Sequence, residues 1–272
     1  MKICFFQVEI LLFLKQNIYF DMTENKEFKK LCRTAGECCV KYRLIDDGDR
    51  LLVGLSGGKD SFMLMHLLDH LSRCAPVEFT FEAATFDPGF ENFNVEKIAE
   101  YCRIHNWKHH VVKMNIPEII AEKSMEDAPC VLCSRLRRGK LYGLARELSC
   151  NKLALGQHLD DVITSFMMSL CRGQGITSMA PKVVPQDPEH PVIIRPLALV
   201  TEELIINCAK QMDFPEKTGF CRYENTVKTG DRAAFSALIG ELSEKIPHLR
   251  ENIAHSLTRV EAKHLLIPPK DK

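Results

Sequence analysis

The sequence has no excess of charge of either sign. Its 272 residues include 36 Lys and Arg against 36 Asp and Glu, so the formal net charge is zero. A nucleic-acid partner would therefore have to be held by local basic patches, because the chain as a whole creates no positive field. Internal repeats and low-complexity segments are also missing, which argues against solenoid and fibrous proteins. A hydrophobic content of 46% argues against a disordered chain and is enough for a full core.

The sequence also lacks an apolar run long enough for a convincing membrane span. Residues 1–21 come nearest, but Gln7 and Glu9 interrupt the pattern and no small-residue cleavage site follows it. Met22 then begins a segment that reads like an ordinary cytoplasmic start. We expect residues 1–21 either to come from an upstream start codon or to form a loosely attached helix; binding to a membrane surface is the weaker alternative. No stable membrane association is expected.

Cysteine, by contrast, is abundant. The 12 cysteines are too irregularly spaced to form the disulfide framework of a secreted protein of this length. A reducing cytoplasm is therefore the expected location of the protein.

Residues 51–61, with the sequence LLVGLSGGKDS, organise the rest of the chain. The apolar block that begins at Leu51 shows no alternation, which is the pattern of a strand buried on both faces in a parallel sheet. The apolar segment 62–71 predicts a helix, with Asp60 or Ser61 placed to cap its first turn. The sequence thus predicts a strand, a short glycine-containing loop and a helix.

The loop between this strand and this helix has the composition of an anion cradle. Gly57 and Gly58 let the backbone take positive φ and turn successive N–H groups inward, and the helix N-terminus adds free donors. Lys59 supplies a mobile cation, while Ser56 and Ser61 supply hydroxyl donors, so the natural guest is a di- or triphosphate. A glycine-rich turn without a ligand is the alternative, but the flanking strand and helix are those that phosphate binding requires.

The spacing of the loop separates it from the G-x-x-x-x-G-K-[ST] phosphate loop, because its glycines and lysine are too close together. The run SGGKDS instead resembles the PP-loop of the ATP pyrophosphatase superfamily, whose members split ATP between the α and β phosphates.

The remaining chain alternates strand and helix patterns. Further strands are expected at 79–86, 109–115, 152–156 and 192–197, and helices at 24–42, 95–106, 133–148, 159–171, 202–212, 232–245 and 249–265. This alternation predicts an α/β fold with a doubly wound parallel sheet and right-handed crossovers. We expect an N-terminal extension and lead-in helix at 1–45, a PP-loop ATP-binding α/β domain at 46–200, and a helical C-terminal portion at 201–272.

Polar side chains follow two more of the expected strands. Asp87 sits at the carboxyl end of the second strand, where an open α/β sheet binds ligands, so it could orient Mg²⁺ or a nucleotide; the run Asp-Pro-Gly is equally ordinary turn chemistry. His158 and Asp161 open the helix after the fourth strand. Acids in a first helical turn suit the helix dipole, but a phosphate loop at the same edge favours a functional role for both residues.

Cys130 and Cys133 form a C-x-x-C pair at the expected start of a helix, followed by Arg135, Arg137 and Arg138. A helix N-terminus and nearby cations lower thiol pKa values and favour thiolates, which act as ligands or nucleophiles. Two buried structural cysteines are the alternative. The arginines, together with Lys140, could bind RNA phosphates or solvate a helix face, and we favour RNA.

Four segments together resemble the tRNA 2-thiocytidine synthetase family of PP-loop enzymes. They are SGGKDS, PCVLCSRLRRGKLYGLAREL, LGQHLDDVITSFMMSLCRGQGITSMAPK and IIRPLALVTEELI, in order and with fitting spacing. Members of that family thiolate C2 of the cytidine at position 32 of the tRNA anticodon loop, using ATP, Mg²⁺ and a [4Fe-4S] cluster held by three cysteines.

The resemblance implies a role for each matching residue. The cluster ligands would be Cys130, Cys133 and Cys221, although the second C-x-x-C common around the third ligand is absent here. Catalysis would fall to Lys59, Asp60 and Asp161, and nucleotide binding to Ser56, Gly57, Gly58, Lys59, Asp60, Ser61, Asp87 and His158. The implied partners are tRNA and a cysteine desulfurase as the sulfur donor, and a homodimer stays open.

Other functions remain open at this point. The chain could be a PP-loop sulfurtransferase acting on another tRNA base or on a small molecule, or a non-catalytic iron-sulfur sensor that keeps a nucleotide loop. A zinc-stabilised RNA-binding module is a further alternative, although structural zinc usually takes a fourth protein ligand and none is evident beside Cys221.

Overall fold

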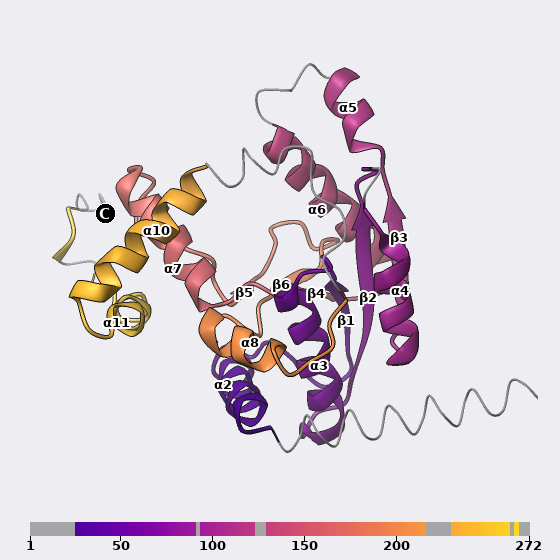
Figure 1. Cartoon of the computed structure of the whole chain (residues 1–272), viewed down its shortest axis with the longest axis horizontal. Coiled ribbons are helices and arrows are strands. Elements are labelled where there is room, and N and C mark those ends of the chain that lie inside the picture. Colours follow the sequence, from indigo (N-terminus) through magenta and orange to yellow (C-terminus); the bar gives the residue numbers. More distant parts are fainter. Residues whose placement is uncertain (1–24, 91–92, 123–128, 216–229, 262–263, 267–272) are drawn as a thin grey trace, which may run out of the picture.

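The computed structural model describes residues 25–90, 93–122, 129–215, 230–261 and 264–266 (Figure 1). Its helices are α2 (Lys26–Tyr42), α3 (Lys59–Cys74), α4 (Val95–Ile104), α5 (Ile116–Glu122), α6 (Pro129–Glu147), α7 (Leu159–Cys171), α8 (Glu202–Ala209), α10 (Asp231–Lys245) and α11 (Leu249–Ser256). Its strands are β1 (Asp49–Gly54), β2 (Phe79–Asp87), β3 (His109–Lys113), β4 (Lys152–Ala154), β5 (Lys182–Val183) and β6 (Val192–Ile194).

The strands form one sheet in the order β3-β2-β1-β4-β6-β5, in which only β5 runs antiparallel to its neighbour. The chain passes from β1 outward to β2 and β3, then returns to the other side of β1 and continues through β4 to β6. The order therefore reverses between β1 and β4, and open α/β sheets bind their ligands beyond the carboxyl ends of such a pair of strands. The expected α/β fold with a doubly wound, mostly parallel sheet is confirmed.

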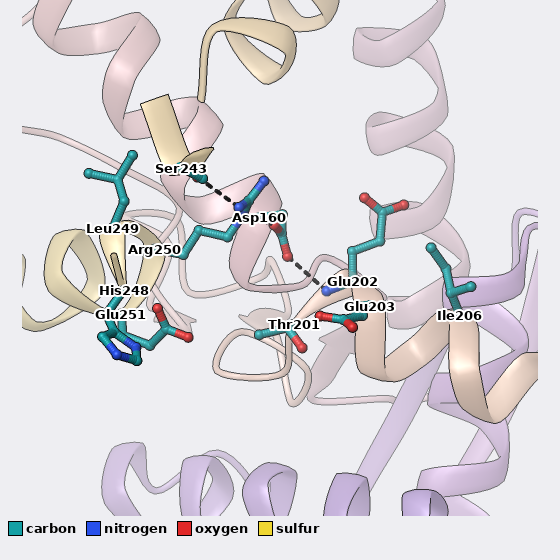
Figure 2. A pocket seen from close by; sticks show the side chains of 10 residues that line it. All are labelled: Asp160, Thr201, Glu202, Glu203, Ile206, Ser243, His248, Leu249, Arg250 and Glu251. Atoms are coloured by element: carbon teal, nitrogen blue, oxygen red, sulfur yellow. Dashed lines mark hydrogen bonds and ion pairs between the residues drawn. The ribbon is translucent and has the colours of Figure 1, made fainter. Parts of the chain in front are cut away.

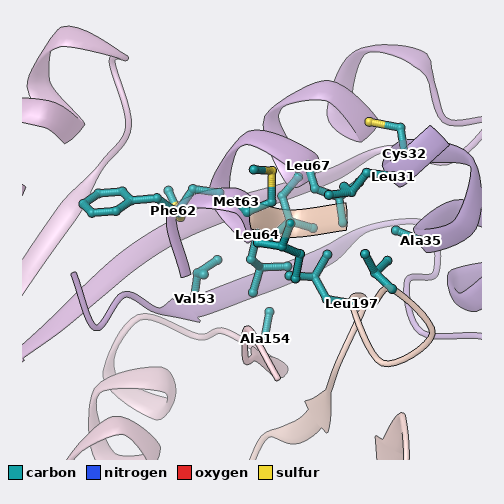
Figure 3. Close-up of a cluster of buried hydrophobic side chains, with 14 of the residues drawn as sticks. Leu31, Cys32, Ala35, Val53, Phe62, Met63, Leu64, Leu67, Ala154 and Leu197 are labelled. Atoms are coloured by element: carbon teal, nitrogen blue, oxygen red, sulfur yellow. The ribbon is translucent and has the colours of Figure 1, made fainter. Parts of the chain in front are cut away.

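The core covers both faces of β1, as its unbroken apolar pattern predicted. Leu51 and Val53 belong to a large cluster with residues of α2, α3, α4 and α8, while Leu52 packs on the opposite face against Leu141 and Ala145 of α6. Figure 3 shows α3 side chains over Val53, with the labelled α2 side chains packed beyond them. The loop after β1 is thus held between two packed layers.

The C-terminal helices pack elsewhere. α10 and α11 contact α7 and each other, and Figure 1 shows them at a distance from the sheet. Ile239 is the one buried residue of α10, where it packs with Leu159 and Ile163 of α7. α11 has no buried residue. This part of the chain therefore joins the fold through a small apolar contact.

The expected elements are confirmed, with differences at their ends. α6 begins at Pro129, four residues before the expected start, and proline in the first helical position is itself a start signal. α11 ends at Ser256 instead of extending to residue 265. α5 and β5, of 7 and 2 residues, were not expected, because elements this short show no periodicity.

No helix of the described residues is both long and apolar enough to cross a membrane.

Candidate active site

In the loop after β1, Gly57 takes the positive φ that was predicted, whereas Gly58 has a φ of −88°. Gly57 has a φ of 79°, and a Cβ there would lie 2.8 Å from Ile98 Cδ1 of α4. The Ser56 N–H donates to Ser61 Oγ at 3.2 Å, and the Gly58 N–H donates to Ser56 Oγ at 3.4 Å. The two serines therefore shape the loop from within, besides offering hydroxyls to a ligand.

The N-terminus of α3 has no side-chain cap among the described residues, and Gly58 is its N-cap. The expectation that Asp60 or Ser61 would cap this helix is therefore wrong. Ser61 Oγ donates to the Gly58 carbonyl at 2.8 Å, and the amide from which it accepts is that of Ser56, which precedes the helix. A first turn without a side-chain acceptor is suited to an anion, which can accept from its amides.

Gly156 brings the turn after β4 against the turn after β1. A Cβ at Gly156 would lie 3.0 Å from the Asp60 carbonyl oxygen and 3.2 Å from Ser61 Cα, both backbone atoms that cannot yield. Only glycine permits this approach. The two turns on either side of the reversal in strand order therefore form one site.

Lys59 is held between two carboxylates in this structure. Its Nζ lies 2.8 Å from Glu202 Oε1, at the start of α8, and 3.1 Å from Asp60 Oδ1. Partial burial alone would lower the pKa of Lys59, but its hydrogen bond to Glu202 and the charge of Asp60 outweigh burial and raise that pKa above its ordinary value. Lys59 is therefore a full cation at the mouth of the loop.

His158 lies between the acids of the two turns. Its Nε2 is 3.9 Å from Asp60 Oδ1 and 3.6 Å from Asp161 Oδ2, and its backbone N–H donates to Asp161 Oδ2 at 3.2 Å. Asp60 Oδ1, apart from its ion pair with Lys59, and His158 Nδ1 are buried without a hydrogen-bond partner in the described part of the chain. Buried polar atoms are normally paired, so these two atoms mark a place for a missing ligand.

The two acids that open α7 are bound by arginines from the C-terminal helices. Asp161 Oδ1 accepts from Arg232 of α10 at 3.0 Å, and Asp160 Oδ1 accepts from Arg250 of α11 at 2.8 Å. Asp160 Oδ2 also accepts from the backbone N–H of Glu202 at 2.7 Å. Asp160 thus fixes the start of α8, and with it the carboxylate that holds Lys59.

A pocket of about 440 Å³ adjoins this network. Figure 2 shows it between α8 on one side and α10 and α11 on the other, with Asp160 between them and Arg250 reaching toward Ser243. Its lining residues are Asp160, Thr201, Glu202, Glu203, Ile206, Ser243, His248, Leu249, Arg250 and Glu251. The pocket is therefore next to the loop, separated from Lys59 by Glu202.

Cys130 and Cys133 lie in the first two turns of α6, and both are half-buried. Leu132 between them packs with Phe86, the residue before the carboxyl end of β2, and Cys133 borders the same cluster. The pair therefore lies near the carboxyl ends of the strands, as does the loop after β1. Cys221, the third expected ligand, lies outside the described residues. Within them, no three His, Cys, Asp or Glu side chains are arranged to hold a metal ion.

Several other cysteines are structural. Cys32, Cys39, Cys102 and Cys208 pack in the core, and burial raises the pKa of each thiol to about 12. Thiols with such pKa values remain protonated and unreactive at neutral pH. The abundance of cysteine is therefore largely a property of the core.

Asp87 has the turn role that its sequence context allowed. Its Oδ1 accepts from the Gly89 N–H at 2.9 Å, and Gly89 has a φ of 76°. A Cβ at Gly89 would lie 3.0 Å from the Met114 carbonyl oxygen, so the turn is also packed against the end of β3. A ligand would have to share this carboxylate with the turn.

Four basic side chains of α6 are exposed to solvent. Arg135, Arg137, Arg138 and Lys140 are exposed, whereas Leu136 and Leu141 pack inward. None of the four cations has a carboxylate partner within the described part of the chain. Their charge is therefore available to an anionic partner.

Sequence reasoning missed Glu202, Gly156, Arg232 and Arg250. Glu202 is the second of three residues in Thr-Glu-Glu, where acids usually suit a helix dipole. The arginines come from helices more than 70 residues beyond the acids in the chain, so no local pattern pairs them. Gly156, which directly precedes the Gln-His pair after a strand, carried the clearest usable signal.

The doubly wound sheet and the Ser-Gly-Gly-Lys-Asp-Ser loop define a PP-loop protein. Residues 22–216 match the family described as PP-loop domain. The chain is 35% identical over 246 residues to the tRNA-cytidine(32) 2-sulfurtransferase of Syntrophotalea carbinolica, covering 90% of this chain and 94% of that protein. It is 36% identical over 247 residues to the protein of the same name from Geobacter sulfurreducens, covering 90% and 95%. The chain belongs to the tRNA-cytidine(32) 2-sulfurtransferase family.

A solved structure has the same fold. The U34-tRNA thiolase NcsA from Methanococcus maripaludis, determined with its [4Fe-4S] cluster, superposes with a TM-score of 0.69 over 89% of this chain and 84% of that one. Sequence identity is 21%, so the likeness shows the shared architecture alone.

Proposed function

We propose that this protein is an ATP-dependent tRNA sulfurtransferase that replaces the C2 oxygen of cytidine 32 with sulfur, through an adenylated intermediate. Family membership supports the reaction, and the meeting of two turns at Gly156 supports the site. The C2 oxygen of cytosine is a poor leaving group, so it must be activated before sulfur can replace it. Attack of this oxygen on the α-phosphate of ATP activates it and releases pyrophosphate.

In this proposal, the loop after β1 binds the phosphates. The uncapped first turn of α3 offers amides to the β- and γ-phosphates, and Gly57 and Gly58 allow the backbone to approach them. Lys59 turns from Glu202 to the phosphates and offsets the charge that develops on the leaving pyrophosphate. His158 lies beside the acids of this site and orients the nucleotide.

The acids of this site fit Mg²⁺. Asp60 Oδ1 is buried and contacts Lys59 alone among the described cations of the loop, and both Asp60 Oδ1 and Asp161 Oδ2 lie within 4 Å of His158 Nε2. Mg²⁺ is commonly held by one or two carboxylates together with substrate phosphates and water, so no larger protein cage is needed. Asp60 and Asp161 would hold the ion, which when bound offsets phosphate charge. Asp87 is a further candidate at the same edge.

The C-x-x-C pair fits a [4Fe-4S] cluster. Cys130 and Cys133 are one helical turn apart at the N-terminus of α6, beside the arginines that favour thiolates. With Cys221 they would provide three thiolate ligands. A cluster held in this way would leave one iron without a protein ligand, where sulfide could be held; a cysteine desulfurase would supply this sulfur as a persulfide, from which a thiol reductant releases sulfide.

The exposed cations of α6 would contact the RNA backbone. Arg135, Arg137 and Arg138 follow the cysteine pair directly, where an anticodon loop must lie if its base is to enter the site. An extruded base is read by its edge and by stacking, and the phosphates on both sides of it require positive charge. We place the reaction in the cytoplasm.

The experiment that tests this proposal is anaerobic reconstitution with tRNA, ATP, Mg²⁺ and sulfide, followed by mass analysis of the tRNA nucleosides. We expect 2-thiocytidine and pyrophosphate to form with the wild-type protein. The Cys221→Ala variant should lose both iron and thiolation, whereas Cys74→Ala, which changes an exposed cysteine of α3, should keep both. Full iron retention in Cys221→Ala would remove Cys221 as a ligand. Thiolation of another base, or no thiolation by the iron-loaded wild type, would contradict the assignment.

A further inference from the structure

Arg232 reaches the site from a part of the chain beyond the PP-loop match. It is the second residue of α10, and its Nη1 donates to Asp161 Oδ1 at 3.0 Å. The matched family region ends at residue 216. Asp161 Oδ2 is at the same time 3.6 Å from His158 Nε2, which is also near Asp60. The guanidinium of Arg232 is therefore separated from the loop by the width of one carboxylate and one imidazole.

The docking of α10 on α7 does not require this contact. Ile239 packs with Leu159 and Ile163, and a separate ion pair joins Arg172, the residue after α7, to Asp231 of α10 at 2.6 Å. An exposed ion pair such as that of Arg232 adds about 0.2–1 kcal/mol, which is small beside the burial of an isoleucine. Arg232 is thus available for a role other than holding the helix.

The cations around the site share one arrangement. Lys59 and Arg232 each pair with a carboxylate, Glu202 and Asp161 respectively, and both side chains remain partly exposed. Guanidinium groups bind phosphate oxygens in bidentate geometry, which a single contact to one carboxylate oxygen does not provide. Asp161 is also a proposed ligand of Mg²⁺, and a divalent ion competes strongly with one exposed arginine for its oxygens.

We propose that Arg232 is a phosphate-binding residue of this site, supplied by the C-terminal helices and held by Asp161 until Mg²⁺ and nucleotide bind. This inference rests on the proposed use of Mg²⁺ and ATP. When Asp161 turns to the metal ion, Arg232 moves to the phosphate chain beside Lys59. The C-terminal helices thereby complete a site that the PP-loop domain begins.

The test is a set of binding measurements on the full-length protein by calorimetry. The probes are the β,γ-imido analogue of ATP with Mg²⁺, inorganic pyrophosphate with Mg²⁺, and adenosine, which has no phosphate. Arg232→Gln should weaken binding of the first two about tenfold, the loss of one charge-assisted contact, and leave adenosine binding unchanged. Arg232→Lys should restore most of the loss, because it keeps the charge. Arg172→Gln, which removes the neighbouring ion pair on the same two helices, should bind all three probes like the wild type.

The possible results of these measurements distinguish phosphate binding by Arg232 from its other roles. Tighter binding of the analogue to Arg232→Gln would mean that the arginine only competes for Asp161, and unchanged binding would mean that it only ties α10 to α7; either result overturns the inference. Equal losses in Arg232→Gln and Arg172→Gln would assign the effect to helix docking and overturn it as well. If the wild type binds neither phosphate probe, the proposed use of ATP fails first, and the inference fails with it.

Discussion

The two regions that meet at the candidate site are built in different ways. α3, which follows the phosphate loop, has an unbroken series of eight buried residues from Ser61 to Leu68 and packs between β1, α2 and α8. α10 has one buried residue and α11 has none, and both reach the site through charged side chains. The loop is thus held in place by a dense core. The acids beside it are instead held by partly exposed ion pairs, which salt weakens and which water or a ligand can replace.

The largest expected difference between the two regions is in stability. Leu64→Ala in α3 removes a fully buried side chain from the main core and should lower the free energy of unfolding by about 2–5 kcal/mol. Ile239→Ala in α10 removes the one buried side chain there, so we expect faster amide exchange in α10 and α11 with a smaller change in urea unfolding of the sheet. Urea denaturation and hydrogen exchange measure the two effects. Equal losses of global stability would mean that the C-terminal helices unfold together with the sheet.

A second prediction concerns the loop itself. Gly57→Ala places a Cβ where φ is 79° and where Ile98 Cδ1 would be 2.8 Å away, so it should cost about 1–3 kcal/mol of stability and weaken nucleotide binding. Gly36→Ala is the matched control, because that helical glycine has no atom within 4 Å of its added Cβ among the described residues. The control should stabilise the protein by up to about 1 kcal/mol. Thermal unfolding and nucleotide titration compare the two variants. Wild-type stability and nucleotide affinity in Gly57→Ala would show that positive φ is not required at this position.

Sequence patterns predicted the elements of both regions but the contacts of the first alone, for a physical reason. The apolar block from Leu51, the two glycines and the apolar segment after Ser61 are contiguous, and burial on both faces leaves a pattern that is visible in the chain. Asp87 and His158 could be placed at the sheet edge because strand ends are shared by a parallel sheet. Which function they have does not follow from position, and Asp87 is already used by its turn.

The contacts of the C-terminal helices could not be derived in the same way. The pairs Asp160–Arg250 and Asp161–Arg232 join residues that are 90 and 71 positions apart. Each pair depends on the final docking angle of a helix with little buried surface. Local helix propensity predicts that such a helix forms but not which residues it contacts. The cap of α3 was mispredicted for a related reason: a site that binds an anion leaves its first turn uncapped, against the usual preference.

The stability of the sheet and of α3 should respond to acid through two histidines, His109 of β3 and His66 of α3. Burial lowers the pKa of His109 to about 4, and the pKa of the fully buried His66 lies well below its usual value. Between pH 6.5 and 4 the unfolded chain therefore binds protons that the native state does not, so stability is complete above pH 6.5 and decreases as the pH falls. In His109→Gln, the loss of unfolding free energy between pH 7 and pH 4 should be smaller than in the wild type by about 1–2 kcal/mol, a value that allows for the partial exposure of His109. Urea midpoints measured from pH 7 to pH 4 provide the comparison, and parallel pH profiles for the wild type and the variant would contradict it.

The smallest expected effect lies in the second region and depends on salt. Arg250 and Asp160 are 34% and 21% exposed, so Arg250→Gln should cost less than about 1 kcal/mol of global stability. Asp160 keeps its hydrogen bond from the Glu202 N–H, so no unpaired buried charge remains. We expect faster amide exchange in α11 at low salt, with the difference from the wild type shrinking in 1 M salt, where the screening length is about 3 Å. Arg103→Gln, which breaks an exposed pair within α4, is the control and should leave α11 unchanged. A large loss for Arg250→Gln that persists at high salt would mean that packing of the arginine, and not its charge, attaches the C-terminal helices to the site.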